Sequence, residues 1–210
     1  MLTLYDCSTA PSPRRARILL AEKGVPHETV AVDLRGGEQL GDAFRAINPQ
    51  CTVPALRLDD GVVLTDNAAI AAYLEARYPT PPLLGITPLE KAEVASWNWR
   101  VEFEGLMAIA EALRNTAPAM KTRALPGPVD YTQIPALAER GIARLKRFLV
   151  ELDARLADRE TIATDRLSIA DITAVVAVDF ARIVRLQPGD EHPHLRRWRA
   201  AMAQRPSMAL

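Results

Sequence analysis

The feature that most constrains the fold is a change of pattern near the middle of the chain. Before residue 79 short apolar strands alternate with helices, and beyond residue 88 only helical periodicity is found. Residues 79–88, PTPPLLGITP, mark the change with four prolines and a glycine. Such a segment forms a stiff connection. The sequence therefore predicts two domains, 1–78 and 89–210, joined by a linker at 79–88.

The first domain is predicted to be a compact α/β module. The pattern gives a strand, a helix ended by Gly24, a second strand, a weak helix broken near Gly41, a hairpin and a last helix. In order, these elements cover residues 2–6, 14–23, 27–34, 37–48, 53–64 and 66–78.

The second domain is predicted to be all-helical. Thr87 and Glu90 form a capping box around Pro88, so a helix starts there and runs to about Asn115. A segment from 119 to 135 is irregular. The later helices cover residues 135–156, 169–184 and 194–204. The middle one follows a second capping box at Ser168 and is apolar nearly all round, which is typical of the buried centre of a bundle.

Composition and charge narrow the possible functions. Lys plus Arg and Asp plus Glu both number 26, so no net field favours nucleic acid or a membrane surface. Two basic clusters, 14–17 and 196–199, are expected to be solvated helix faces. No apolar stretch approaches the ~20 residues that span a bilayer, and no secretory signal pattern is seen. We therefore expect a cytoplasmic protein without nucleic-acid or membrane partners.

The cysteines and histidines do not suggest a metal centre. The cysteines have no metal-type spacing, and the histidines are dispersed. These residues are Cys7, Cys51, His27, His192 and His194.

Three segments of the first domain carry polar chemistry, and the first is NPQCTVPAL at 48–56. Pro54 lacks the N–H of a sheet ladder, so it fits an edge position or a cis bond. If the bond is cis, the backbone N–H and C=O of Val53 stay free to pair with a peptide-like ligand. An ordinary edge-strand proline is the alternative.

The second segment is LTDNAAI at 64–70, where a strand leads directly into a helix. The first-turn N–H groups and the Asn67 amide form a cradle suited to a carboxylate. Alternatively, Thr65, Asp66 or Asn67 only caps the helix.

The third segment is the loop from Cys7 to Ser12. Ser12 precedes Pro13 and is expected at the N-cap of the first helix. The helix dipole stabilises a thiolate there by ~0.3–2 kcal/mol, and a hydroxyl donor adds ~1.5–3 kcal/mol. At ~1.4 kcal/mol per unit, the two together lower a thiol pKa by roughly one to three units.

Together these motifs resemble the cytosolic glutathione transferases. The resemblance covers essentially the whole chain and rests on PRRARILLAEKG, NPQCTVPAL, LTDNAAI, the proline-rich linker and LSIADIT. TPLEK, RVEFE, FARIVRLQ and QRPS are most similar to the fungal and bacterial branch related to the second yeast glutathione transferase. The resemblance implies a thioredoxin-like N-terminal domain, a helical-bundle C-terminal domain, glutathione as co-substrate and usually a homodimer.

The resemblance also implies a glutathione site. Val53 would pair with the cysteinyl backbone, while Asp66 and Asn67, where many relatives have Glu-Ser, would hold the γ-glutamyl end. Gln39 would lie near the glycyl carboxylate, and Glu102 would reach the ligand's amino group from the partner subunit. The full expected set is Gln39, Thr52, Val53, Pro54, Asp66, Asn67 and Glu102.

The sequence leaves open which group activates the thiol. Ser12 has the N-cap location, and Ser8 lies nearer the active hydroxyl of some serine-type classes. In the yeast-like branch a water is held by polar residues of the C-terminal domain, where this chain has Asn115 and Thr116. Cys7 ends the first strand, too early for the helix dipole, and is expected to be a small buried hydrophobe.

The electrophile is expected to bind between the domains. Thr9 of the opening loop would contribute one wall, and Met107, Glu111 and Arg114 the other. The leading hypothesis is a transferase that adds the glutathione thiolate to a small hydrophobic electrophile or reduces a peroxide. The alternatives are a Cys7-dependent reductase of disulfides or quinones, and a non-catalytic interaction protein of the same fold.

Overall fold

The computed structural model describes all 210 residues, and the chain divides into two compact units. Unit 1 comprises Met1–Pro81 together with Leu125–Asp130 and Leu210. Unit 2 comprises Pro82–Ala124 and Tyr131–Ala209. No helix of the chain combines the length and the hydropathy needed to cross a lipid bilayer.

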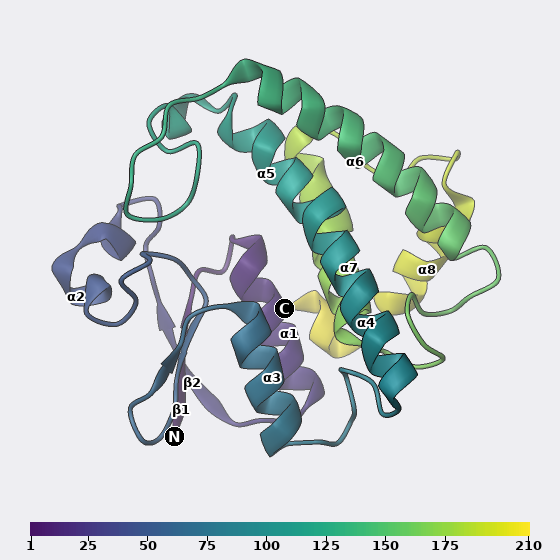
Figure 1. Cartoon of the computed structure of the whole chain (residues 1–210), viewed down its shortest axis with the longest axis horizontal. Coiled ribbons are helices and arrows are strands. Elements are labelled where there is room, and N and C mark those ends of the chain that lie inside the picture. Colours follow the sequence, from purple (N-terminus) through teal and green to yellow (C-terminus); the bar gives the residue numbers. More distant parts are fainter. The chain divides into compact units, whose positions relative to one another are not determined.

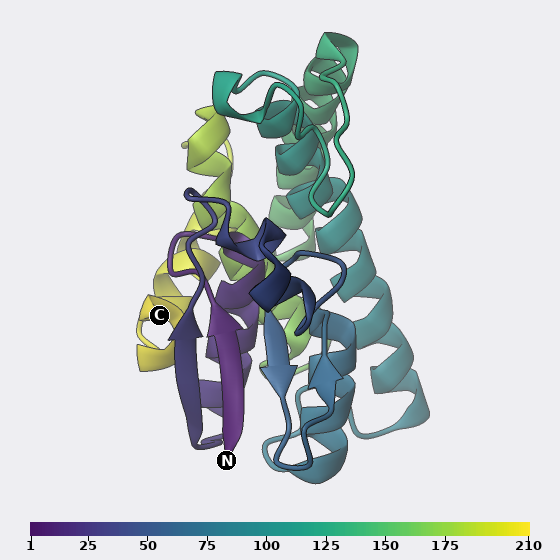
Figure 2. The same ribbon diagram turned by 90° about the vertical axis from the view of Figure 1, so that its left-hand side faces the viewer.

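Unit 1 holds a four-stranded mixed sheet in the order β2-β1-β3-β4. The strands are β1 Leu2–Asp6, β2 His27–Ala31, β3 Ala55–Arg57 and β4 Val63–Leu64. β1 runs parallel to β2 and antiparallel to β3, as Figure 2 shows. Every residue of the central strand β1 is buried. The antiparallel pairing of β3 with β4 confirms the predicted hairpin.

The helices of unit 1 follow the predicted pattern. They are α1 Pro11–Glu22, the 3-10 turn η1 Glu38–Leu40, α2 Asp42–Arg45 and α3 Asn67–Arg77. α1 ends before Gly24, whose φ of +60° suits glycine at this position. The weak helix is split into η1 and α2 at Gly41, as expected. α1 and α3 pack side by side (Figure 1), so their buried apolar faces form one core with the sheet.

Unit 2 is entirely helical, as predicted. Its helices are α4 Pro88–Arg100, η2 Val101–Leu106, α5 Met107–Arg114, η3 Pro118–Met120, α6 Pro135–Arg155, α7 Ile169–Phe180, η4 Ala181–Val184, α8 Pro193–Met202 and η5 Pro206–Ala209. Both predicted capping boxes, at Thr87 and Ser168, are present. α7 is buried along Ile169–Val178. It is the centre of the bundle that its apolar sequence predicted.

The long helix after the linker contains a feature that the periodicity did not predict. α4, η2 and α5 form one continuous rod in Figure 1, but η2 is a π-helical turn. Its Gly105 is buried so closely against α6 that a Cβ there would lie 3.1 Å from the Phe148 ring. π-helical turns shift the helical register by one residue, which changes the side chains that face a neighbour.

Candidate active site

The register of the sheet brings the three polar segments of unit 1 to one end. Tyr5, next to the last residue of β1, pairs with Val30 of β2 and with Ala55, the first residue of β3. Leu64, the last residue of β4, pairs with Leu56. The loop after β1, the Val53-Pro54 peptide before β3 and the segment after β4 therefore leave the sheet at the same end.

The opening loop enters α1 earlier than the sequence suggested. The N-cap is Ala10, which makes no side-chain capping bond, so the expectation that Ser12 is the N-cap is wrong. Pro11 and Pro13 both fit the first turn, because N–H groups there have no partner within the helix. Ser12 consequently lies within the first turn. Its carbonyl and hydroxyl oxygens accept hydrogen bonds from Asn67 Nδ2 at 3.2 and 3.1 Å.

The backbone of the opening loop is held by a residue that the sequence did not single out. Arg17 donates to Asp6 Oδ1 at 2.5 Å and to the carbonyls of Cys7 and Ser8 at 3.4 and 3.2 Å. Its side chain is 14% exposed and that of Asp6 is 9% exposed. The expectation that this basic cluster is a solvated face is therefore wrong for Arg17. A charged residue ending a buried strand was the available signal, since such a charge needs a partner.

The other side chains of the loop are less constrained. Ser8 and Thr9 are exposed, and Thr9 Oγ1 lies 3.5 Å from Cys7 Sγ. Cys7 is half-buried and packs against the cluster that includes Tyr5 and Val53. The loop is thereby joined by apolar contact to the peptide at Val53.

The Val53-Pro54 peptide bond is cis, one of the two states expected. Val53 N–H and C=O make no hydrogen bond within the chain, and the β1–β3 register begins at Ala55. Thr52, the preceding residue, is held by Asn48, whose Nδ2 donates to the Thr52 carbonyl oxygen at 2.8 Å and to its hydroxyl at 3.1 Å. Val53 therefore presents one free donor and one free acceptor just before β3.

The N-terminus of α3 is capped as one alternative predicted, while the Asn67 amide that was expected in a carboxylate cradle donates to Ser12 instead. Asp66 is the N-cap, and its Oδ1 accepts from Ala69 N at 2.8 Å. The N–H groups of Asn67 and Ala68 make no hydrogen bond within the chain. Gln39, on η1 after β2, is buried, and its Oε1 has no hydrogen-bond partner. This end of the sheet thus presents unfilled donors and acceptors.

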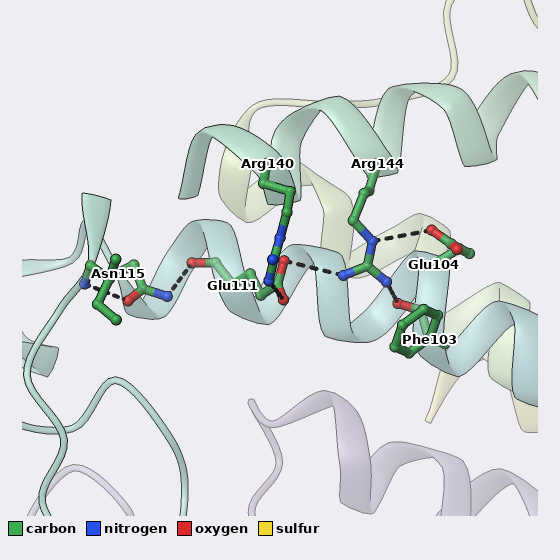
Figure 3. A network of polar contacts seen from close by, with 7 residues as sticks. Phe103, Glu104, Glu111, Asn115, Arg140 and Arg144 are labelled. Atoms are coloured by element: carbon green, nitrogen blue, oxygen red, sulfur yellow. Dashed lines mark hydrogen bonds and ion pairs between the residues drawn. The ribbon is translucent and has the colours of Figure 1, made fainter. Parts of the chain in front are cut away.

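Glu111, one of the expected site residues of unit 2, belongs to a network of contacts with arginines of α6, shown in Figure 3. Arg144 of α6 donates to Glu104 at 3.2 Å, to Glu111 at 3.1 Å and to the Phe103 carbonyl at 2.5 Å. Arg140 adds a bond to Glu111 at 2.8 Å. Burial acts to raise the pKa of Glu104, but the arginines of α6 outweigh it and the pKa lies below its usual value.

Asn115 and Arg114 end α5 and bind the chain beyond it. Asn115 donates to the Glu111 carbonyl at 2.9 Å and accepts from Ile134 N at 2.9 Å. Arg114 donates to the Arg123 carbonyl at 2.7 Å, and burial lowers its pKa. Both side chains thus make contacts within unit 2.

Exposed aromatic side chains lie on the same long helix. The rings of Trp99 and Phe103 stack with centroids 5.1 Å apart and are 62% and 43% exposed. Trp97 instead contacts Arg100 and Arg155, whose Cζ atoms lie 4.9 and 5.0 Å from its ring centroid, so the two tryptophans face different directions, as predicted. Met107 is also exposed, and Glu102 lies in η2.

Comparison with known proteins gives a consistent result. The model of the glutathione S-transferase N-terminal domain matches residues 9–77, and that of the C-terminal domain matches residues 117–206. The chain is 36% identical to glutathione S-transferase 2 of Saccharomyces cerevisiae over 210 residues, which cover 99% of this chain and 88% of that protein. The chain belongs to the glutathione S-transferase family.

Solved structures of this family share the whole fold. The crystal structure of Gtt2 from Saccharomyces cerevisiae has a TM-score of 0.89 and 36% identity, covering 99% of this chain and 98% of that one. A glutathione S-transferase domain-containing protein from Marinobacter aquaeolei has a TM-score of 0.87 and 36% identity, covering 98% and 99%. The predicted fold class, a thioredoxin-like α/β domain with an all-helical domain, is confirmed. No group of His, Cys, Asp and Glu side chains is arranged to hold a metal ion.

Proposed function

We propose that this chain is a glutathione transferase that acts in the cytoplasm as a homodimer. It binds glutathione, lowers the pKa of its thiol and adds the thiolate to a small hydrophobic electrophile or a peroxide. The observation that carries the proposal is the free backbone of Val53 at the sheet end where the N-termini of α1 and α3 meet, in a chain of this family.

Glutathione fits this end of the sheet by its chemistry. Its cysteinyl backbone pairs antiparallel with Val53, whose N–H and C=O are free. The γ-glutamyl carboxylate binds the unfilled N–H groups of Asn67 and Ala68, and Asp66 attracts the ammonium group. The glycyl carboxylate lies near the Gln39 side chain. Thr52 and Pro54 shape the backbone, and Glu102 of the partner subunit supplies a second acid.

Ser12 is the favoured donor to the thiolate. It lies in the first turn of α1, where the helix dipole favours a negative charge. Ser8 is exposed and contributes its carbonyl to Arg17. Asn115 uses its amide on the backbone of unit 2, which leaves it less free to hold a water. Positioning and thiol activation then perform the reaction without a covalent enzyme intermediate.

The homodimer is supported by the stacked pair of Trp99 and Phe103. Two large rings with such exposure on one helix are unusual for a surface without a partner. Sedimentation analysis of Trp99→Ala tests this, since loss of the stack is expected to shift the dimer toward monomer.

The deciding experiment is the pKa of bound glutathione, measured by thiolate absorbance against pH. We expect a value below that of free glutathione in the wild type, raised by Ser12→Ala and unchanged by Ser8→Ala. A rise only in Ser8→Ala would transfer the role to Ser8. A lowered value that neither variant changes would favour a bound water near Asn115. Binding without any lowering would indicate a non-catalytic protein of this fold.

A further inference from the structure

We infer that Asn67 and Arg15 fix the direction of the Ser12 hydroxyl group, so that Ser12 acts only as a hydrogen-bond donor toward the bound ligand. Asn67 is then a positioning residue for Ser12, a role different from the ligand contact that the family resemblance implied. The inference rests on the proposed function, because the ligand that receives this bond is the glutathione thiolate.

The hydrogen-bonding partners of the Asn67 amide determine which of its two ends, the NH₂ group or the oxygen, faces Ser12. Its nitrogen lies 3.2 Å from the Ser12 carbonyl oxygen and 3.1 Å from the Ser12 hydroxyl oxygen. A carbonyl oxygen can only accept. The reversed amide would place two acceptor oxygens against each other, so the NH₂ group must face Ser12. Asn67 is buried, which holds this orientation.

A second donor reaches the same hydroxyl oxygen from α1 itself. Arg15 Nη2 lies 3.3 Å from Ser12 Oγ, and a guanidinium group has no acceptor. Arg15 is three residues after Ser12, which is the spacing of neighbours on one helix face. The hydroxyl oxygen of Ser12 therefore accepts from a neutral amide and from a cation.

The count of lone pairs then determines what Ser12 can still do. A serine hydroxyl has two lone pairs and one proton, and both lone pairs are engaged by Asn67 and Arg15. No group of the chain accepts the remaining proton. Hydrogen bonds in a chain polarise one another, so donation by Arg15 makes the hydroxyl a better donor. The hydroxyl can therefore stabilise an anionic ligand group, and it has no lone pair left to accept a hydrogen bond from a ligand donor.

The sharpest test replaces Asn67 by its acidic isostere. In Asn67→Asp the carboxylate at position 67 is an acceptor, so the Ser12 hydroxyl should turn inward and donate to it. We expect the pKa of bound glutathione to rise by about one to two units, to the value found in Ser12→Ala. Asn67→Ala, which removes one donor without adding an acceptor, should raise it by less.

Two controls separate this effect from charge and from ligand contact. Ala72→Asp places the same charge on another exposed residue of α3, five residues after Asn67, where it does not touch Ser12. It should raise the pKa much less than Asn67→Asp. In the double variant Ser12→Ala/Asn67→Ala, which adds no charge, the pKa should equal that of Ser12→Ala alone, because the side chain at position 67 acts only through Ser12.

The outcomes distinguish this inference from the proposed function. A lowered pKa in the wild type that Asn67→Asp changes no more than Ala72→Asp overturns the inference alone. A further rise in the double variant also overturns it, by assigning the Asn67 side chain to the ligand. Wild-type protein that binds glutathione without lowering its thiol pKa overturns both. Should Asn67→Asp fail to fold, Arg15→Met tests the same oxygen and should raise the pKa.

Discussion

Arg17 and Asp6 form an ion pair under the opening loop, with Arg17 Nη1 at 2.5 Å from Asp6 Oδ1. The same guanidinium donates to the carbonyls of the next two residues. One helix residue thus fixes the end of the central strand and the start of the loop that leads to Ser12. The backbone of the loop is thereby held in place without secondary structure of its own.

Replacing only one partner of this ion pair should destabilise the protein. Arg17→Met leaves the Asp6 carboxylate nearly buried and unpaired, so the free energy of unfolding should fall by about 3 kcal/mol in urea titrations. The double variant Asp6→Asn/Arg17→Met should recover part of the loss, since the buried charge is gone. A loss below about 0.5 kcal/mol in the single variant would show that the pair behaves as an exposed one.

Lys23 should be essential to the end of α1. Its buried Nζ donates to the carbonyls of Tyr78 and Pro81 at 2.7 and 2.8 Å and pairs with Glu75 at 2.8 Å. Lys23→Met should lower the unfolding free energy by about 3 kcal/mol, because three acceptors lose their donor. Lys91→Met, at an exposed position of α4, is the matched control and should leave the unfolding free energy nearly unchanged. Equal stability of the two variants would contradict the role of Lys23.

Gly141 should be intolerant of even one methyl group. A Cβ there would lie 2.5 Å from the Ala108 carbonyl oxygen, where α6 crosses α5. Helix propensity alone would stabilise Gly141→Ala by about 1 kcal/mol. The clash with backbone should reverse the sign and destabilise unit 2 by about 2 kcal/mol. Thermal unfolding gives the sign directly, and a higher Tm would mean that the two helices separate easily.

Glu90 should make stability depend on pH in the acidic range. The hydrogen bond from the Ile86 N–H, with those from the Thr87 N–H and Arg166, holds the pKa of Glu90 below its usual value of 4.5. Its contribution is thus fully present above the unfolded pKa and is lost as the pH falls through the lower folded pKa. Tm against pH should be flatter in this range for Glu90→Gln. Glu139→Gln, at an exposed position of α6, should keep the wild-type slope.

Cys7 should be dispensable for transferase activity. It packs half-buried against the apolar cluster of Val53, four residues before α1 begins. Cys7→Ala should keep kcat/KM for a conjugation reaction within about twofold, since no step uses its sulfur. Abolished activity in a correctly folded variant would instead support the Cys7-dependent reductase.

Much of the fold could be predicted from local patterns. The run LTLYD, the glycine after α1 and the two capping boxes each specify their element through side-chain chemistry that acts within a few residues. The π-helical turn at 101–106 could not be predicted, because it depends on the packing of Gly105 against Phe148 of another helix. The start of α1 was misplaced because Pro11 and Pro13 fit a first turn equally well.

The sequence by itself determined which segments carry the chemistry: a Val-Pro peptide, a capped helix start and a loop of hydroxyls. Only the tertiary structure decided how they act on one another. Ser12 and Asn67 stand 55 positions apart in the chain, yet the pairing of the strands brings them within 3.1 Å. The direction of a hydroxyl proton depends on which donors surround its oxygen, and those donors come from two helices that meet only in the folded chain.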